Sequence, residues 1–158
     1  MKSGSYWNQI ETAYNKVSIY DGPEIFLRDF KGLRPFIGDL LAAHWILSEF
    51  LNGGLLQFFL NPTGVLAPEA VLAFRRMGLF KISDVIQQAM GYFGKQYPRS
   101  RDERVSIIAR NTGFEPDETI ELFKTNPFEE LDDELDMLGN NDFEKVYNIM
   151  DEYTLKNS

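Results

Sequence analysis

The polar residues best suited to chemistry stand inside the most apolar stretch of the sequence, residues 44–61 (HWILSEFLNGGLLQFFLN). They are His44, Glu49, Asn52 and Gln57. A carboxylate and two amides among large hydrophobic side chains could line a ligand pocket. They could instead form a structural hydrogen-bond network, because buried polar groups need partners. We favour the network, since no second carboxylate or base is placed to complete acid–base catalysis with Glu49.

His44 is the only histidine, and the chain contains no cysteine. These counts exclude a multi-histidine zinc site, thiolate ligands and cysteine nucleophiles. No phosphate-binding loop follows Gly53-Gly54, and residues 132–136 lack the alternating oxygen ligands and the glycine of a calcium loop. We therefore expect His44 to be a buried, hydrogen-bonded histidine. We predict no catalytic residue, no metal and no cofactor, and hence a protein that is not an enzyme.

Negative charge is concentrated towards the C-terminal end of the chain. Residues 115–152 hold 14 acidic residues against Lys124 and Lys145 alone, a net charge of −12, whereas the whole chain carries −8 and the remainder therefore +4. Such a segment repels nucleic acid and attracts basic surfaces. We therefore expect a basic protein as partner and no direct binding of nucleic acid.

Six of these acids share one predicted helix, residues 128–138. At about 100° per residue, its apolar residues Phe128, Leu131, Leu135 and Leu138 fall on one face. The carboxylates that cover the rest of its surface are Glu129, Glu130, Asp132, Asp133, Glu134 and Asp136. A solvated helix face is the ordinary explanation of this pattern. The functional alternative is that the carboxylates imitate a row of DNA phosphates and occupy the basic groove of a DNA-binding protein.

The middle of the chain is basic. Lys95, Arg99, Arg101, Arg104 and Arg110 fall within 16 positions, residues 95–110. This segment could bind nucleic acid, but intramolecular pairing or head-to-tail self-association explains it at least as well.

The elements that must position these side chains are predicted to be helical. Apolar residues recur at helical spacing, and no segment sustains the two-residue alternation of a strand. The pattern predicts an all-α single domain, residues 1–158, of about eight helices around a central apolar helix that begins near Phe36. Gly53 and Gly54 inside that helix cost about 1 kcal/mol each relative to alanine. They should therefore either break the helix or allow a close backbone contact.

Several predicted helices have capping signals. Ser100 begins a capping box for a helix that ends at Gly113. Ser83 and Asn141 are expected to cap two further helices, and a short helix is expected over residues 116–123.

The central stretch also carries a family resemblance. The residues concerned are Trp45, Glu49, Asn52-Gly53-Gly54, Gln57-Phe58-Phe59 and Asn61, followed by Ala67-Pro68-Glu69-Ala70 and Gly78. Over about residues 36–155 the chain resembles the DNA-mimic protein (DMP)-like family of bacterial helical domains. The resemblance implies an all-α fold. From the family's named member, it also implies a dimer that imitates duplex DNA and binds a helix-turn-helix transcription factor.

Charge and resemblance together predict a non-enzymatic interaction domain, a DNA mimic that binds a basic DNA-binding regulator. One alternative is a small-molecule or enzymatic pocket around His44, Glu49, Asn52 and Gln57. Another is an immunity-type protein that neutralises a basic toxin. The N-terminal residues do not resemble a signal peptide and no run of about 18 apolar residues occurs, so we expect a cytoplasmic protein without membrane contact. The 13 Phe, 7 Tyr and 2 Trp could fill the core or support a homodimer.

Overall fold

The computed structural model describes residues 5–113 and 125–158, and every regular element within these ranges is a helix. The α-helices are α1 (Tyr6–Tyr14), α2 (Pro23–Lys31), α3 (Pro35–Leu60), α4 (Ala67–Arg76), α5 (Phe80–Met90), α6 (Arg101–Thr112), α8 (Glu129–Gly139) and α9 (Glu144–Asn157). Two short 3-10 helices, η1 (Pro62–Leu66) and η2 (Gly91–Phe93), extend the turns after α3 and α5. The predicted all-α fold of about eight helices is confirmed. The helix expected over residues 116–123 lies outside the described residues.

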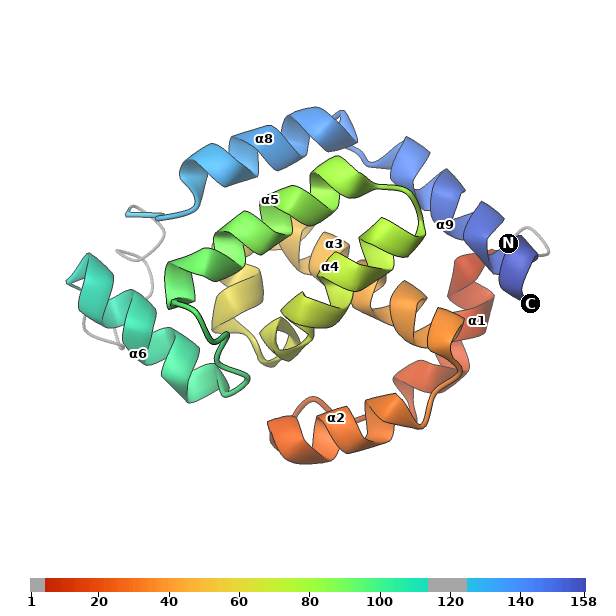
Figure 1. Cartoon of the computed structure of the whole chain (residues 1–158), viewed down its shortest axis with the longest axis horizontal. Coiled ribbons are helices and arrows are strands. Elements are labelled where there is room, and N and C mark those ends of the chain that lie inside the picture. Colours follow the sequence, from red (N-terminus) through yellow and green to blue (C-terminus); the bar gives the residue numbers. More distant parts are fainter. Residues whose placement is uncertain (1–4, 114–124) are drawn as a thin grey trace.

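The apolar helix α3 lies at the centre of the molecule, as its composition predicts (Figure 1). It contacts α1, α2, α4, α6, α8 and α9. A helix with neighbours around most of its circumference has to be apolar over most of its surface. Accordingly Leu40, Leu41, Leu55 and Leu56 are all fully buried.

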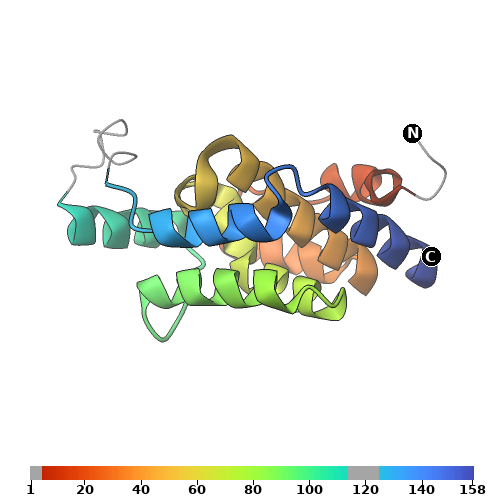
Figure 2. The same cartoon turned by 90° about the horizontal axis from the view of Figure 1, so that it is seen from above.

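The other helices form a shell around α3. The α4–α5 hairpin covers one face, and α8 and α9 follow each other along one edge of the molecule, over α5 and α3 (Figures 1 and 2). The first and last helices meet at one end, where the backbone N–H of Tyr6 donates to a carboxylate oxygen of Asp151 at 2.7 Å. Because α8 contacts α5 and α3 on one side only, it is a surface helix whose other side faces solvent.

The capping predictions are partly confirmed. Ser100 Oγ accepts the N–H of Glu103 at 3.4 Å at the start of α6, and Gly113 ends that helix with φ 79°. The prediction for Ser83 is wrong, because α5 already begins at Phe80 and the buried Ser83 hydroxyl donates to the Val71 carbonyl of α4 at 2.8 Å.

The prediction that Asn141 caps the last helix is also wrong. The neighbouring Asp142 accepts the Glu144 N–H at 3.0 Å. Asn141 instead has φ 68°, a left-handed conformation that asparagine tolerates in turns.

Over the ranges 5–113 and 125–158, no helix taken singly has the length and apolarity needed to cross a membrane. Helix α3 and the segment that runs on to Arg76 meet that criterion only together, as a pair bent by 80°.

Candidate functional site

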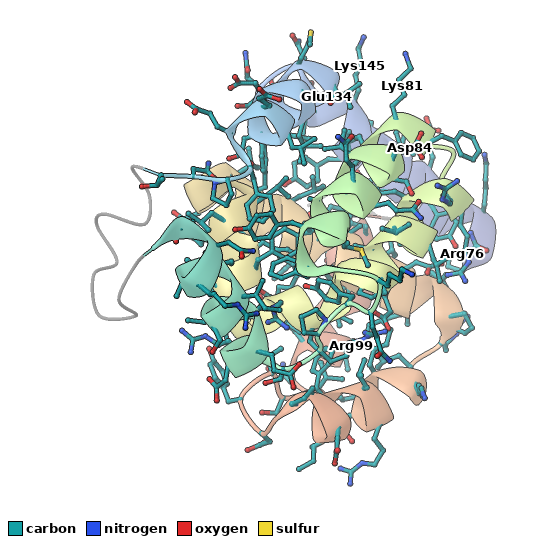
Figure 3. The ribbon with its side chains drawn as sticks, turned by 60° about the vertical axis from the view of Figure 1, so that its left-hand side comes forward. Arg76, Lys81, Asp84, Arg99, Glu134 and Lys145 are labelled. Atoms are coloured by element: carbon teal, nitrogen blue, oxygen red, sulfur yellow. The ribbon has the colours of Figure 1, made fainter. Side chains whose placement is uncertain are left out.

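Helix α8 turns its apolar side inwards and its carboxylates outwards. Leu135 is buried, as is Phe128 just before the helix, and Leu131 and Leu138 pack against the core. On the opposite side four acids are exposed: Glu129, Glu130, Asp133 and Glu134. We refer to these four residues as the acidic row. Glu134 points away from the body of the molecule in Figure 3.

The acidic row is electrically uncompensated within the described structure. Five ion pairs occur there, and none includes a residue of the row. The row spans five helical steps, about 7.5 Å at 1.5 Å per residue, so its four charges are on average about 2.5 Å apart along the helix axis. Duplex DNA carries one negative charge per about 1.7 Å of its axis. The row therefore approaches the linear charge density of DNA over a short distance.

Asp132 belongs to the same helix but has a different role. One of its carboxylate oxygens accepts the backbone N–H of Leu55 at 2.9 Å, and the other accepts Asn126 Nδ2 at 2.8 Å. Burial raises the pKa of Asp132 above its ordinary value, the two hydrogen bonds lower it, and the nearby Asp136 and Asp133 raise it. Asp132 therefore connects α8 to α3 instead of facing solvent. Asp136, one turn further along α8, is half-buried as well.

The two glycines of α3 explain how Asp132 reaches the helix. Gly53 and Gly54 leave the helical conformation, and Gly54 has φ 75° with ψ −176°, which residues with a side chain rarely adopt. A Cβ on Gly54 would lie 2.7 Å from Asp132 Oδ2. The glycine pair therefore both breaks α3 and admits a close contact. Asp132 accepts an N–H that in a continuous helix would donate to the carbonyl of Leu51.

Glu49 is the centre of a polar network at the C-terminal end of α3. Its Oε2 accepts Gln57 Nε2 at 2.7 Å and Asn61 Nδ2 at 2.8 Å, and its Oε1 accepts the Thr63 hydroxyl at 3.1 Å. Three donors converge on this one carboxylate, which spans the break at Gly53-Gly54. Of the residues in the network that we favoured from the sequence, Glu49 and Gln57 are hydrogen-bonded to each other, whereas Asn52 is not among the three donors. Thr63 also belongs to this network and was not expected from the sequence.

His44 lies in a separate aromatic cluster. Its Nδ1 is 3.1 Å from the hydroxyl of Tyr6, and the rings of Tyr6, Trp7 and Tyr14 surround it. Burial lowers the pKa of His44 from 6.5 to about 4, so the ring is neutral at pH 7. The adjacent Trp45 donates its indole N–H to the Tyr14 hydroxyl at 2.7 Å. Both residues therefore serve to hold α1 against α3.

Asn52 is exposed at the rim of a shallow hollow near Asp136 and Asn141. The four polar residues of the central stretch are thus in three different surroundings. His44 contacts α1, Glu49 and Gln57 share the network, and Asn52 faces solvent.

The basic segment is used inside the molecule. Arg104 is fully buried and donates to the carbonyls of Phe59, Asn61, Pro98 and Arg99, at distances of 2.7–3.1 Å. Arg101 donates to the Leu60 carbonyl at 2.6 Å, and Arg99 donates to Val65 and pairs with Glu69 at 2.7 Å. The arginines therefore bind the carbonyl end of α3 and the following turn. Lys95 and Arg110 are exposed.

Two further residues matter here. Asn126, which precedes α8, accepts the Phe128 N–H at 2.9 Å and also donates to Asp132. Asp39 is buried in α3 and pairs with Arg76 at 2.5 Å, and it accepts the hydroxyl of Tyr153 at 2.7 Å. Nothing in the sequence indicated Asp39, because its partners come from helices distant in the chain.

These observations define a helical domain with a broken central helix and an acidic outer helix that is fastened to the break. The chain belongs to the DMP19-like protein family, whose model matches residues 31–157. The family predicted from the central stretch is thereby confirmed. The matched span includes the break, the Glu49 network and α8, and leaves α1 outside. The same comparisons gave no match to a curated protein or to a solved structure.

Proposed function

We propose that this protein is a non-enzymatic interaction domain that presents the acidic row of α8 to the DNA-binding surface of a basic protein. The observation that carries the proposal is the set of four exposed carboxylates, without ion pairs in the described structure, at an axial spacing of about 2.5 Å, which approaches the spacing of about 1.7 Å in duplex DNA. A surface that binds DNA through its phosphates accepts such a row by the same electrostatic contacts.

The attachment of α8 to the rest of the molecule supports this function. The side chains of Leu135 in α8 and Phe128 just before it are buried in the core. Asp132 attaches the helix to the break in α3. A row of charges on a preorganised helix loses little conformational freedom when it binds, so more of the electrostatic attraction contributes to affinity.

The neighbouring helices limit the acidic surface. Lys145 of α9 and Lys81 of α5 are both exposed and point outwards in Figure 3. The mimicry would therefore be confined to the α8 side of the molecule, consistent with the positive charge of the chain outside residues 115–152. We infer a partner that binds one side of a short DNA-like row rather than one that encloses a long duplex.

The experiment that tests this proposal compares two variants of equal net charge. In the first, the acidic row is neutralised (Glu129→Gln, Glu130→Gln, Asp133→Asn, Glu134→Gln). In the second, four exposed acids elsewhere are neutralised (Glu11→Gln, Asp21→Asn, Glu24→Gln, Glu152→Gln). Each protein is immobilised at low salt and exposed to lysate of the source organism. Retained proteins are then eluted first with duplex DNA and afterwards with salt.

The proposal predicts a retained basic DNA-binding protein that duplex DNA displaces and that increasing salt releases, because exposed charges are screened. Retention should be lost in the acidic-row variant and kept in the control variant. A retained protein that resists duplex DNA but elutes with salt would favour a basic toxin over a DNA-binding regulator. Equal retention by both variants would contradict the role of the row.

A further inference from the structure

A groove on another side of the molecule has a chemistry opposite to that of α8. It lies between α2, the first turns of α3 and α4, and its volume is about 450 Å³. Sites for small molecules typically occupy about 300–1,000 Å³. Its walls are mainly apolar, formed by Leu27, Phe30 and Leu33 on one side and Leu72 on the other. Leu72 is 49% exposed, which is unusual for a leucine on a helix that otherwise buries its apolar residues.

The rim of this groove carries the cations Lys31, Arg34 and Arg76. Arg76 is already paired with Asp39. Within the described residues, Lys31 and Arg34 have no carboxylate partner, and Arg34 only lies over the ring of Phe36 at 4.8 Å. Two cations without carboxylate partners therefore line an apolar groove, on a protein whose net charge is −8.

The acids that line the groove do not cancel this charge. Asp39 is 6% exposed and is held by Arg76 and by the Tyr153 hydroxyl. Glu69 is paired with Arg99 at 2.7 Å. The first turn of α3 adds to the positive charge of the groove, because a helix N-terminus carries a partial positive charge and Arg34 and Pro35 line the groove.

We propose that this groove binds an amphiphilic carboxylate, a small molecule with an aliphatic chain and one anionic head group. The carboxylate lies between Lys31 and Arg34, and the chain packs along Phe30, Leu33 and Leu72. Burying the chain removes both its own apolar surface and that of Leu72 from water, which provides the larger part of the affinity. The two cations select an anionic head group over a neutral one. This binding is independent of the function proposed for α8.

Decanoate is a suitable probe, used below the concentration at which it forms micelles. Binding to the full chain is measured by calorimetry, and its location by the NMR shifts of the Leu33 and Gly38 amides and the Leu72 methyl groups. Decanol serves as the neutral probe of equal chain length, and decyltrimethylammonium as the cationic one. The Lys31→Gln/Arg34→Gln variant removes the head-group contacts, and Leu72→Gln alters the apolar wall. Lys81→Gln/Arg110→Gln is the matched control, since it removes one exposed lysine and one exposed arginine outside the groove.

We expect saturable one-to-one binding of decanoate, with shifts confined to the groove. The Lys31/Arg34 variant and Leu72→Gln should each weaken it by about five-fold or more, in keeping with the loss of roughly 1 kcal/mol of contacts. The control variant should change it less than about two-fold, and decanol and the cationic probe should bind more weakly. Absence of saturable binding, equal affinity for decanol, or equal losses in the control variant would each overturn the proposal.

Discussion

The carboxylate of Asp132 on α8 accepts the backbone N–H of Leu55 on α3, 77 positions earlier in the chain, at 2.9 Å. This single contact joins the acidic helix to the break in the central helix. It works as an N-cap does, because it satisfies an N–H that the broken helix leaves without its usual carbonyl partner. The residue that performs it is therefore not interchangeable with the exposed acids beside it.

The first prediction compares Asp132→Ala with Asp133→Ala, the same substitution at adjacent positions. Removing Asp132 leaves the Leu55 N–H and the Asn126 amide without their acceptor, so the free energy of unfolding should fall by about 1–2 kcal/mol. The exposed Asp133 should change it by less than about 0.5 kcal/mol. Urea unfolding of both variants measures the difference, and equal values would contradict the capping role.

The second prediction concerns Glu49. Glu49→Ala removes the shared acceptor of Gln57, Asn61 and Thr63, and the Thr63 hydroxyl is buried. Unfolding should become easier by about 2–3 kcal/mol, because donors left unpaired away from water are costly. Glu11→Ala on α1, at an exposed helical position, is the control and should be nearly neutral. A catalytic or ligand-binding role without a structural one would leave the stability of Glu49→Ala close to that of the control.

The pH dependence of stability provides a third prediction. Burial lowers the pKa of His44 from 6.5 to about 4, so between these values the unfolded chain binds a proton that the folded chain does not. Stability should therefore decrease as the pH falls from about 6.5 to about 4. In His44→Gln this contribution is absent.

The measurement for His44 is the difference in the free energy of unfolding between the unmodified protein and His44→Gln across pH 4–8. That difference should be constant above about pH 7. At lower pH the unmodified protein should lose stability relative to His44→Gln. The comparison cancels the titration of carboxylates common to both proteins. A difference that is constant over the whole range would show that His44 is accessible to protonation in the folded state.

The sequence predicted the elements better than it predicted their contacts. The break at Gly53-Gly54 and the capping box at Ser100 depend on residues close together in the chain, and both are confirmed. The prediction for Ser83 was wrong because a serine serves equally well as a cap or as a small buried donor where two helices cross. Only the packing of α4 against α5 decides between these two roles.

In the candidate sites, too, residues close in the chain were predicted better than contacts between distant ones. Helical periodicity placed Asp132 among the outward-facing acids, yet the missing side chain of Gly54 allows it to approach α3. His44, Glu49 and Asn52 are close in sequence, but each faces a different neighbour. The sequence identified a family and an acidic helix, whereas the pairing of Asp39 with Arg76 and Tyr153 depends on tertiary contacts that no local pattern specifies.

The last prediction tests the internal use of the basic segment. Arg104 is fully buried and donates to four carbonyls around the end of α3, while Arg110, six residues later on the same helix, is exposed. Arg104→Ala should lower the free energy of unfolding by about 3–5 kcal/mol, because it leaves several buried carbonyls unpaired and creates a cavity. The free energy of unfolding of Arg104→Lys should lie between those of the unmodified protein and Arg104→Ala, since an ammonium group keeps the charge and offers three donors instead of five. Arg110→Ala should be within about 0.5 kcal/mol of the unmodified protein. If Arg104 served mainly to bind nucleic acid, Arg104→Ala would instead be as stable as Arg110→Ala, and urea unfolding of the three variants distinguishes the two outcomes.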